Sequence, residues 1–141
     1  MMVTLNLEAT LDYTGKAMSF VEDELRRHDF PERLYPEILI AVEEVFVNIA
    51  SYAYKPEQPG DVTLSVKIDE KAIIRFEDSG TPFNPLDGAE PDLDAPIMER
   101  DIGGLGIHFV KNLMDETEYG YEGGKNILTI SKGKSETGEV M

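Results

Sequence analysis

Hydrophobic and polar residues alternate along residues 3–9 and 62–68, and this period predicts β-strands. Three further strands are predicted at residues 72–77, 119–121 and 127–131. The turn Asp69-Glu70-Lys71 joins the second stretch to the third, so these two are expected to form a hairpin. Gly123-Gly124 is the expected turn between the last two strands.

Three other regions are expected to be helical. In the first, from about Tyr13 to His28, the apolar residues recur on one helical stripe. The second helix is predicted to begin near Pro31 or Pro36, because proline is tolerated in a first turn, and to end at about Tyr54. A third helix is predicted from about Leu105.

The stretch from Thr81 to Gly103 has no period and contains four prolines and six acidic residues. Structureless stretches of this length inside compact domains are usually functional lids or disordered segments. A polar tail is expected from about Lys132. The predicted order is strand, helix, helix, two strands, lid, helix and two strands. This order favours an α+β fold in a single domain, residues 1–141, with a mixed sheet covered on one face by helices.

The composition excludes some classes of partner. The chain has 13 basic and 28 acidic residues, for a net charge of -15, so nucleic acid and anionic membranes are poor partners. A basic protein partner is compatible with this charge, and so is a surface that simply keeps the protein in solution. The chain contains no cysteine, which suits a reducing cytosol, and no apolar run of membrane-spanning length.

Glu44 and Asn48 lie four residues apart on the second predicted helix, about 40° apart around its axis. A carboxylate can accept a proton from an attacking hydroxyl, and a neutral amide oxygen suits Mg²⁺. Glu43 points about 100° away from Glu44 and is the weaker candidate for a base. Taken alone, the same spacing also fits a solvent-facing acidic pair beside a polar residue.

Asp78 follows the strand at residues 72–77 and has the parity of its core residues, so its carboxylate is expected to face inward. An inward carboxylate is costly without a hydrogen-bond donor, and the exocyclic amine of adenine is one such donor. Gly80 would allow a base to approach the backbone closely. An ordinary Asp-Ser-Gly turn is the alternative.

Gly103-Gly104-Leu105-Gly106 ends the predicted lid and opens the third helix. The free amides of a helix N-terminus attract phosphate, and glycines allow a tight approach. The alternative is structural glycine at a loop-to-helix junction. Neither a Walker-type loop nor the strand that precedes a dinucleotide fingerprint is found here.

In this order, the three motifs resemble those of the ATPase superfamily that joins gyrase, Hsp90, histidine kinases and MutL. The chain is most similar to its anti-sigma-factor serine kinases. Ala41 to Tyr54 resembles their first motif, Phe76 to Pro85 their second with its Pro-Phe-Asn-Pro continuation, and Gly103 to Glu116 their third. Gly124 to Thr129 is similar to their closing strand. The resemblance implies a two-layer α/β sandwich of the Bergerat type with an ATP lid.

The resemblance also implies a role for each site residue. Glu44 would be the general base and Asn48 the Mg²⁺ ligand. Asp78 would bind adenine, and Gly80 would line its pocket. The remaining implied nucleotide-binding residues are Arg100 in the lid, near the terminal phosphate; Gly103, Gly104, Leu105 and Gly106 against the phosphates; and Asn126, near a position where many relatives have threonine, facing the pocket.

The function implied by the resemblance is that of an ATP-dependent serine/threonine kinase that acts as an anti-sigma factor in the bacterial cytoplasm. Such a kinase binds a sigma factor, and it phosphorylates a serine of a STAS-type antagonist in a partner switch that regulates transcription. A homodimer is implied as well. Two alternatives are an ATP-binding regulatory module without phosphotransfer and the catalytic module of a histidine kinase. The latter fits poorly, because the chain has no phospho-accepting domain.

Overall fold

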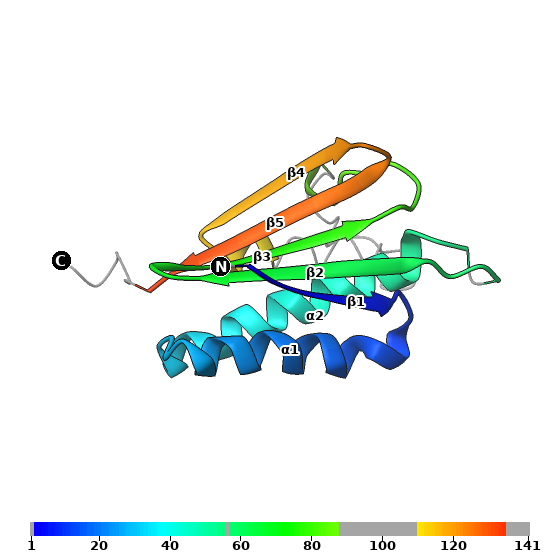
Figure 1. The fold of residues 1–141 in the computed structure, drawn as a ribbon. Coiled ribbons are helices and arrows are strands. Elements are labelled where there is room, and N and C mark those ends of the chain that lie inside the picture. Colours follow the sequence, from blue (N-terminus) through cyan, green and yellow to red (C-terminus); the bar gives the residue numbers. More distant parts are fainter. Residues whose placement is uncertain (1, 56, 88–109, 135–141) are drawn as a thin grey trace, which may run out of the picture.

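The computed structural model describes residues 2–55, 57–87 and 110–134. Within these ranges the chain forms a five-stranded sheet and two long helices that pack against it (Figure 1). The elements are β1 (Val3–Glu8), η1 (Leu11–Tyr13), α1 (Thr14–Arg27), η2 (Glu32–Leu34), α2 (Tyr35–Tyr52), β2 (Asp61–Ile68), β3 (Lys71–Asp78), η3 (Pro85–Asp87), β4 (Glu116–Glu122) and β5 (Lys125–Gly133).

The strand order is β1-β2-β3-β5-β4, and each pairing among these strands is antiparallel. The expectation of a mixed sheet is therefore wrong for the described strands. The physical reason is the pair of helices between β1 and β2, which carries the chain away and back again. The chain therefore enters β2 at the end where β1 finished, and the Ala9 amide bonds the Gly60 carbonyl at 2.8 Å.

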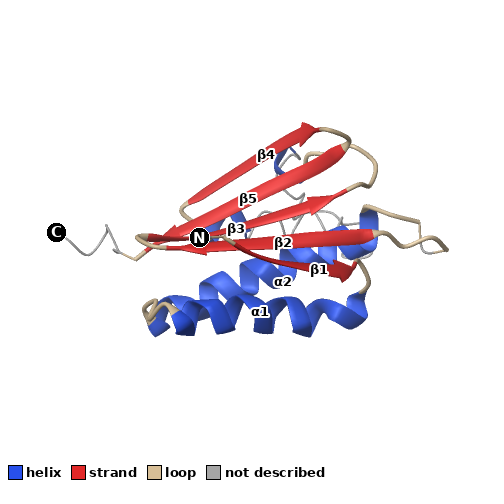
Figure 2. Cartoon of the chain, in the orientation of Figure 1, coloured by secondary structure: helices blue, strands red, loops and turns tan. Residues whose placement is uncertain are grey.

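Helices cover one face of the sheet, which confirms the predicted α+β architecture in two layers (Figure 2). The strand register aligns the apolar side chains in rows across the covered face. One such row is Leu5, Leu64, Phe76, Leu128 and Tyr119. Burying these rows against α1 and α2 is the main source of stability for a domain of this size.

The two long helices begin and end close to their predicted limits. In α1, Ala17, Val21 and Leu25 are buried on one stripe. The chain leaves this helix through Asp29, whose positive φ of 54° is a conformation that Asp tolerates better than most residues. In α2, Pro36 occupies the first turn, as predicted. None of the helices in the described ranges has the length and apolar composition to cross a membrane.

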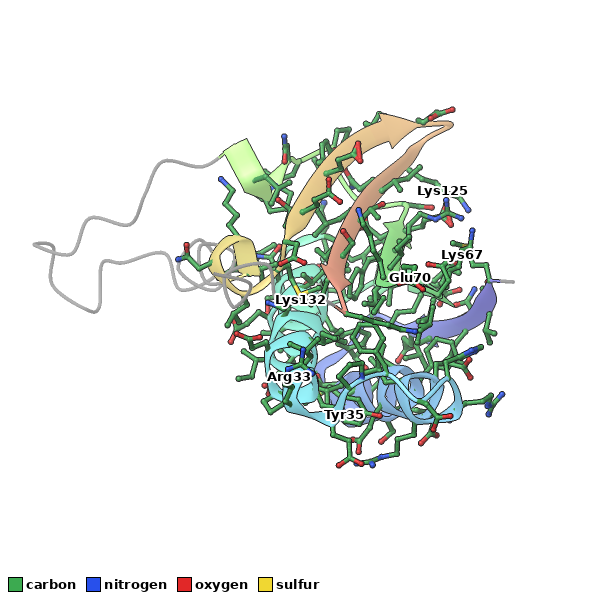
Figure 3. All side chains as sticks on the ribbon, turned by 90° about the vertical axis from the view of Figure 1, so that its left-hand side faces the viewer. Arg33, Tyr35, Lys67, Glu70, Lys125 and Lys132 are labelled. Carbon is green, nitrogen blue, oxygen red and sulfur yellow. The ribbon has the colours of Figure 1, made fainter. Side chains whose placement is uncertain are left out.

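Lys132 joins three elements at the end of the sheet where β5 finishes. Figure 3 shows Lys132 between β5, α2 and the short helical stretch 110–113. Its ammonium group donates to the Leu113 carbonyl at 2.7 Å and lies 3.2 Å from Glu37 and 3.8 Å from Asp115. The prediction of a polar tail from Lys132 is therefore too early, because β5 continues to Gly133.

Candidate functional site

The predicted adenine-binding residues lie at the opposite end of the sheet from Lys132. There β3 ends, β5 begins and α2 ends, side by side (Figure 1). The antiparallel register places Asp78 of β3 directly opposite Asn126 of β5. Val62 of β2 and Leu7 of β1 continue the same row on the covered face. Asp78 therefore faces inward, as its strand parity predicts.

Asp78 is a buried carboxylate, with only 6% of its surface exposed. Its Oδ1 atom accepts hydrogen bonds from the Gly80 amide at 2.9 Å and from Asn126 Nδ2 at 3.0 Å. These two donors offset the cost of removing the charge from water. Both bonds fall on the same oxygen, and no hydrogen bond to Oδ2 occurs within the described residues. Oδ2 can therefore accept a hydrogen bond from a ligand.

Asn126 is buried and bonds several groups around Asp78. Besides Asp78, its Nδ2 donates to the carbonyls of Thr81 at 3.1 Å and Gly80 at 3.4 Å. Its Oδ1 accepts from the Phe83 amide at 3.1 Å and from the Tyr119 hydroxyl. The inward orientation expected for Asn126 is thus present, but its described polar contacts are with the protein itself.

The segment Ser79–Phe83, which we call the strap, leads from β3 toward the predicted lid. Its backbone amides are bonded to elements on both sides. Ser79 N donates to the Tyr54 hydroxyl at 2.7 Å, and Thr81 N donates to the Ala53 carbonyl at 3.3 Å. Gly80 N donates to Asp78, and Phe83 N donates to Asn126. Pro82 has no backbone N–H, so every backbone N–H of the strap has a hydrogen-bond partner. The strap is therefore fixed to α2 on one side and to β5 on the other.

Gly80 lies close against the end of α2. A Cβ atom at this position would lie 2.3 Å from the Ala53 carbonyl oxygen, a distance that side chains do not adopt. The glycine is required here by the adjacent helix end. Its expected place in the wall of an adenine pocket remains a prediction.

Tyr54 fastens the same helix end to the sheet. Its hydroxyl accepts from Ser79 N and donates to the Asp61 carbonyl at 2.7 Å, so it bridges β2 and the strap. Burial raises the pKa of this hydroxyl, so it remains a neutral donor at physiological pH. Sequence reasoning did not assign a role to Tyr54 or Tyr119. Tyr54 closes the first motif, and this is the signal that could have found it. The pairing of Tyr119 with Leu128 on the covered face is visible only in the structure.

Glu44 and Asn48 lie on α2, before the helix end that holds the strap. Asn48 is buried, and within the described part of the chain its side chain forms no hydrogen bond. Glu44 is half-buried. Burial, with a smaller contribution from the neighbouring charge of Glu43, raises the pKa of Glu44 above its usual value. A carboxylate with a raised pKa is a stronger proton acceptor, as a general base requires.

The described residues offer few protein ligands to a Mg²⁺ ion. No group of three or more His, Cys, Asp or Glu side chains that could hold a metal occurs in residues 2–55, 57–87 and 110–134. Mg²⁺ at nucleotide sites typically takes one or two protein oxygens and completes its shell with waters and phosphate oxygens. The unbonded side-chain oxygen of Asn48 fits this mode of binding.

The predicted phosphate-binding part of the site lies outside the described residues. This part comprises Arg100, Gly103, Gly104, Leu105 and Gly106. The third predicted helix is described only at 110–113, where Val110 is buried in the core. Residues 81–87, from the later part of the strap through η3, are the described beginning of the predicted lid, whose later residues also fall outside.

Comparison with known proteins adds evidence independent of this geometry. The pattern of the histidine kinase-like ATPase domain family matches residues 7–132. Serine-protein kinase RsbW of Listeria monocytogenes is 29% identical over 136 residues, covering 89% of this chain and 83% of that protein. Serine/threonine-protein kinase BtrW of Bordetella bronchiseptica is 24% identical over 129 residues, covering 91% of each.

Two solved structures share the fold. The RsbU and RsbW domains of a Mycobacterium tuberculosis protein match with a TM-score of 0.67 and 13% identity, covering 94% of this chain and 32% of that one. The Acinetobacter baumannii histidine kinase AdeS matches with a TM-score of 0.51 and 16% identity, covering 96% of this chain and 70% of that one.

The relatives RsbW and BtrW confirm the resemblance to anti-sigma-factor serine kinases that the three motifs predict. They also support ATP use and protein kinase activity. The family pattern extends over nearly the whole chain. The chain therefore belongs to the histidine kinase-like ATPase domain family.

Proposed function

We propose that this protein transfers the γ-phosphoryl group of ATP to a serine of a STAS-type antagonist, and that it binds a sigma factor when the antagonist is phosphorylated. The two activities would form a partner switch in the bacterial cytoplasm, with the kinase acting as a homodimer. The observation that carries the proposal is the half-buried Glu44 with its raised pKa, on the same helix whose end holds the strap that follows Asp78. The similarity of the chain to the protein kinases RsbW and BtrW supports the proposal.

In the proposed complex, Asp78 accepts a hydrogen bond from the 6-amino group of adenine through Oδ2. The burial of Asp78 favours this contact, because a donor compensates the remaining lone pairs of a carboxylate that is largely shielded from water. The lid arginine Arg100 and the motif Gly103-Gly104-Leu105-Gly106 would bind the phosphates. Asn48 would hold Mg²⁺, which when bound neutralises charge on the phosphates.

Phosphotransfer then requires one proton acceptor. The serine oxygen of the antagonist forms a bond to the γ-phosphorus, and the bond from this phosphorus to the β–γ bridging oxygen breaks to release ADP. Glu44 orients the serine hydroxyl and takes its proton. Glu43, on a different side of α2, is not required as a base.

The test uses the purified chain, Mg-ATP labelled at the γ-phosphate and a STAS-type antagonist. Glu44→Gln should abolish labelling of the antagonist while nucleotide affinity is retained, because only the proton acceptor is removed. Glu43→Gln is the matched control and should still label. Equal labelling by Glu44→Gln would remove Glu44 from the mechanism. Binding of ATP and antagonist by the wild-type chain without any labelling would favour the alternative, a regulatory module without phosphotransfer.

A further inference from the structure

Asn126 lies at the centre of a hydrogen-bond network that links β5, β4, Asp78 and the strap. The contacts determine which way its amide points, a question that atom positions alone often leave open. Asp78 offers only acceptor oxygens, so the NH₂ group must face it. The Phe83 amide is only a donor, so the carbonyl oxygen must face the strap.

The hydrogen-bonding capacity of the Asn126 amide is filled by these contacts. Its two N–H groups are used by Asp78 at 3.0 Å and by the Thr81 carbonyl at 3.1 Å, with the Gly80 carbonyl at 3.4 Å as a weaker shared acceptor. Its oxygen accepts from the Phe83 amide and the Tyr119 hydroxyl. A side-chain amide has two donors and two lone pairs. A nucleobase could bond Asn126 only by displacing one of these partners.

We infer that Asn126 is a positioning residue that makes the site selective for a 6-aminopurine without touching the base. It holds Asp78 through Oδ1, so that Oδ2 is the oxygen left for the ligand. It also fixes the strap that covers the end of α2. Tyr119 in turn holds the amide of Asn126 in its orientation. This inference rests on the proposed binding of ATP and replaces the predicted direct contact between Asn126 and the nucleotide.

The chemistry of Asp78 explains why its orientation governs selectivity. A carboxylate at a fixed position binds a base more tightly if the base donates a hydrogen bond there. If the base lacks the donor, one lone pair of the carboxylate stays unpaired. A carboxylate that rotates freely can turn toward water instead. The difference in affinity between a base with the donor and a base without it then becomes smaller. The property to measure is therefore the ratio of two affinities.

The experiment titrates the full chain with Mg-ATP and with the Mg complex of purine riboside triphosphate, which has hydrogen in place of the 6-amino group. The wild-type chain should prefer ATP by about tenfold or more. Asn126→Ala should reduce this preference to about twofold or less. Tyr119→Phe, which removes only the hydroxyl that holds Asn126, should reduce it by a smaller factor. Asn6→Ala is the control, because Asn6 is exposed in β1, at the edge of the sheet opposite β4, and this variant should keep the full preference.

Asn126→Asp adds a pH readout that a merely structural role would not move. The new carboxyl would face Asp78 without the N–H, and two adjacent carboxyls share a proton when the pH falls. The preference for ATP should be lost at pH 8 and return partly toward pH 5, whereas in the wild-type chain it should stay constant. Among the described residues, Tyr54 and Tyr119 interact electrostatically with Asp78, and both remain neutral over this range because burial raises the pKa of each.

The outcomes test the proposed function and the positioning role of Asn126 separately. A wild-type chain that does not bind ATP would overturn the proposed function. A wild-type preference that Asn126→Ala leaves intact would overturn the positioning role alone, even if both affinities fall together. If Asn126→Ala does not fold, Tyr119→Phe decides, and an unchanged ratio in that variant would overturn the inference.

Discussion

At the scale of single residues, Glu44 shows how its proposed catalytic role opposes stability. The folded protein raises the pKa of its carboxyl above the ordinary value of 4.5, first through burial and then through the charge of Glu43. Above the folded-state pKa the carboxyl is ionised whether the chain is folded or not, but burial penalises the charge only in the folded state. Glu44 therefore lowers the free energy of unfolding at pH 7. This penalty disappears as the pH falls through the folded-state pKa to below 4.5.

We therefore predict that Glu44→Gln is more stable than the wild-type chain at pH 7, and that the difference becomes smaller as the pH is lowered toward 4.5. Free energies of unfolding from urea titrations at the two pH values provide the measurement. Glu43→Gln should also stabilise the protein at pH 7, by a smaller amount, because it removes only the second contribution. A Glu44→Gln variant that is less stable than the wild type at pH 7 would contradict this account.

At the scale of elements, the strap depends on how closely β3 approaches the end of α2. Gly80 allows this approach, and the bond from Thr81 N to the Ala53 carbonyl follows from it. Tyr54 and Asn126 then hold the strap from its two sides. Because Asp78 immediately precedes the strap, the position of its carboxylate is coupled to the contact between these elements.

We predict that Gly80→Ala lowers the free energy of unfolding by about 1–3 kcal/mol, the usual cost of forcing extra atoms into a packed contact. ATP affinity should fall with it, because Asp78 moves with the strap. Gly120→Ala is the matched control: Gly120 lies in β4, and nothing lies within 4 Å of a Cβ atom built there. That variant should be neutral or slightly stabilising. Equal stabilities of the two variants, measured by urea unfolding, would show that the approach at Gly80 is not tight in solution.

At the scale of the whole molecule, the described portion of the site is assembled from three parts of the chain that only the folded state brings together. These are α2, the turn after β3, and the start of β5. A ligand that bridges such parts binds the folded chain and not the unfolded one, so its binding energy adds to the free energy of unfolding.

We predict that Mg-ATP at about 100 times its Kd stabilises the protein by about 2.7 kcal/mol and raises its Tm by roughly 5–10 °C. Thermal unfolding followed by circular dichroism, with and without nucleotide, gives the measurement. Adding excess EDTA should remove most of the increase if Asn48 holds Mg²⁺, and Asn48→Ala should behave like the wild type in EDTA. Full stabilisation by ATP in EDTA would exclude a role for the metal in binding.

The sequence alone determined the elements and the class of site. The helices and strands follow from local periods. For example, the helical period from Tyr13 to His28 corresponds closely to the observed limits of α1. The three ordered motifs identified the family, because residue types at short spacing are visible without a fold. The inward direction of Asp78 also followed from the two-residue period of its strand.

Only the tertiary structure decided the pairing of strands and the partners of the polar groups. The antiparallel direction of the sheet depends on where two helices return the chain, which no local pattern encodes. That Asn126 is saturated by Asp78, the strap and Tyr119 depends on a register between strands 48 residues apart. The raised pKa of Glu44 likewise depends on what buries it. Hydrogen-bond partners and desolvation arise from contacts distant in sequence, so they become known only when the chain is folded.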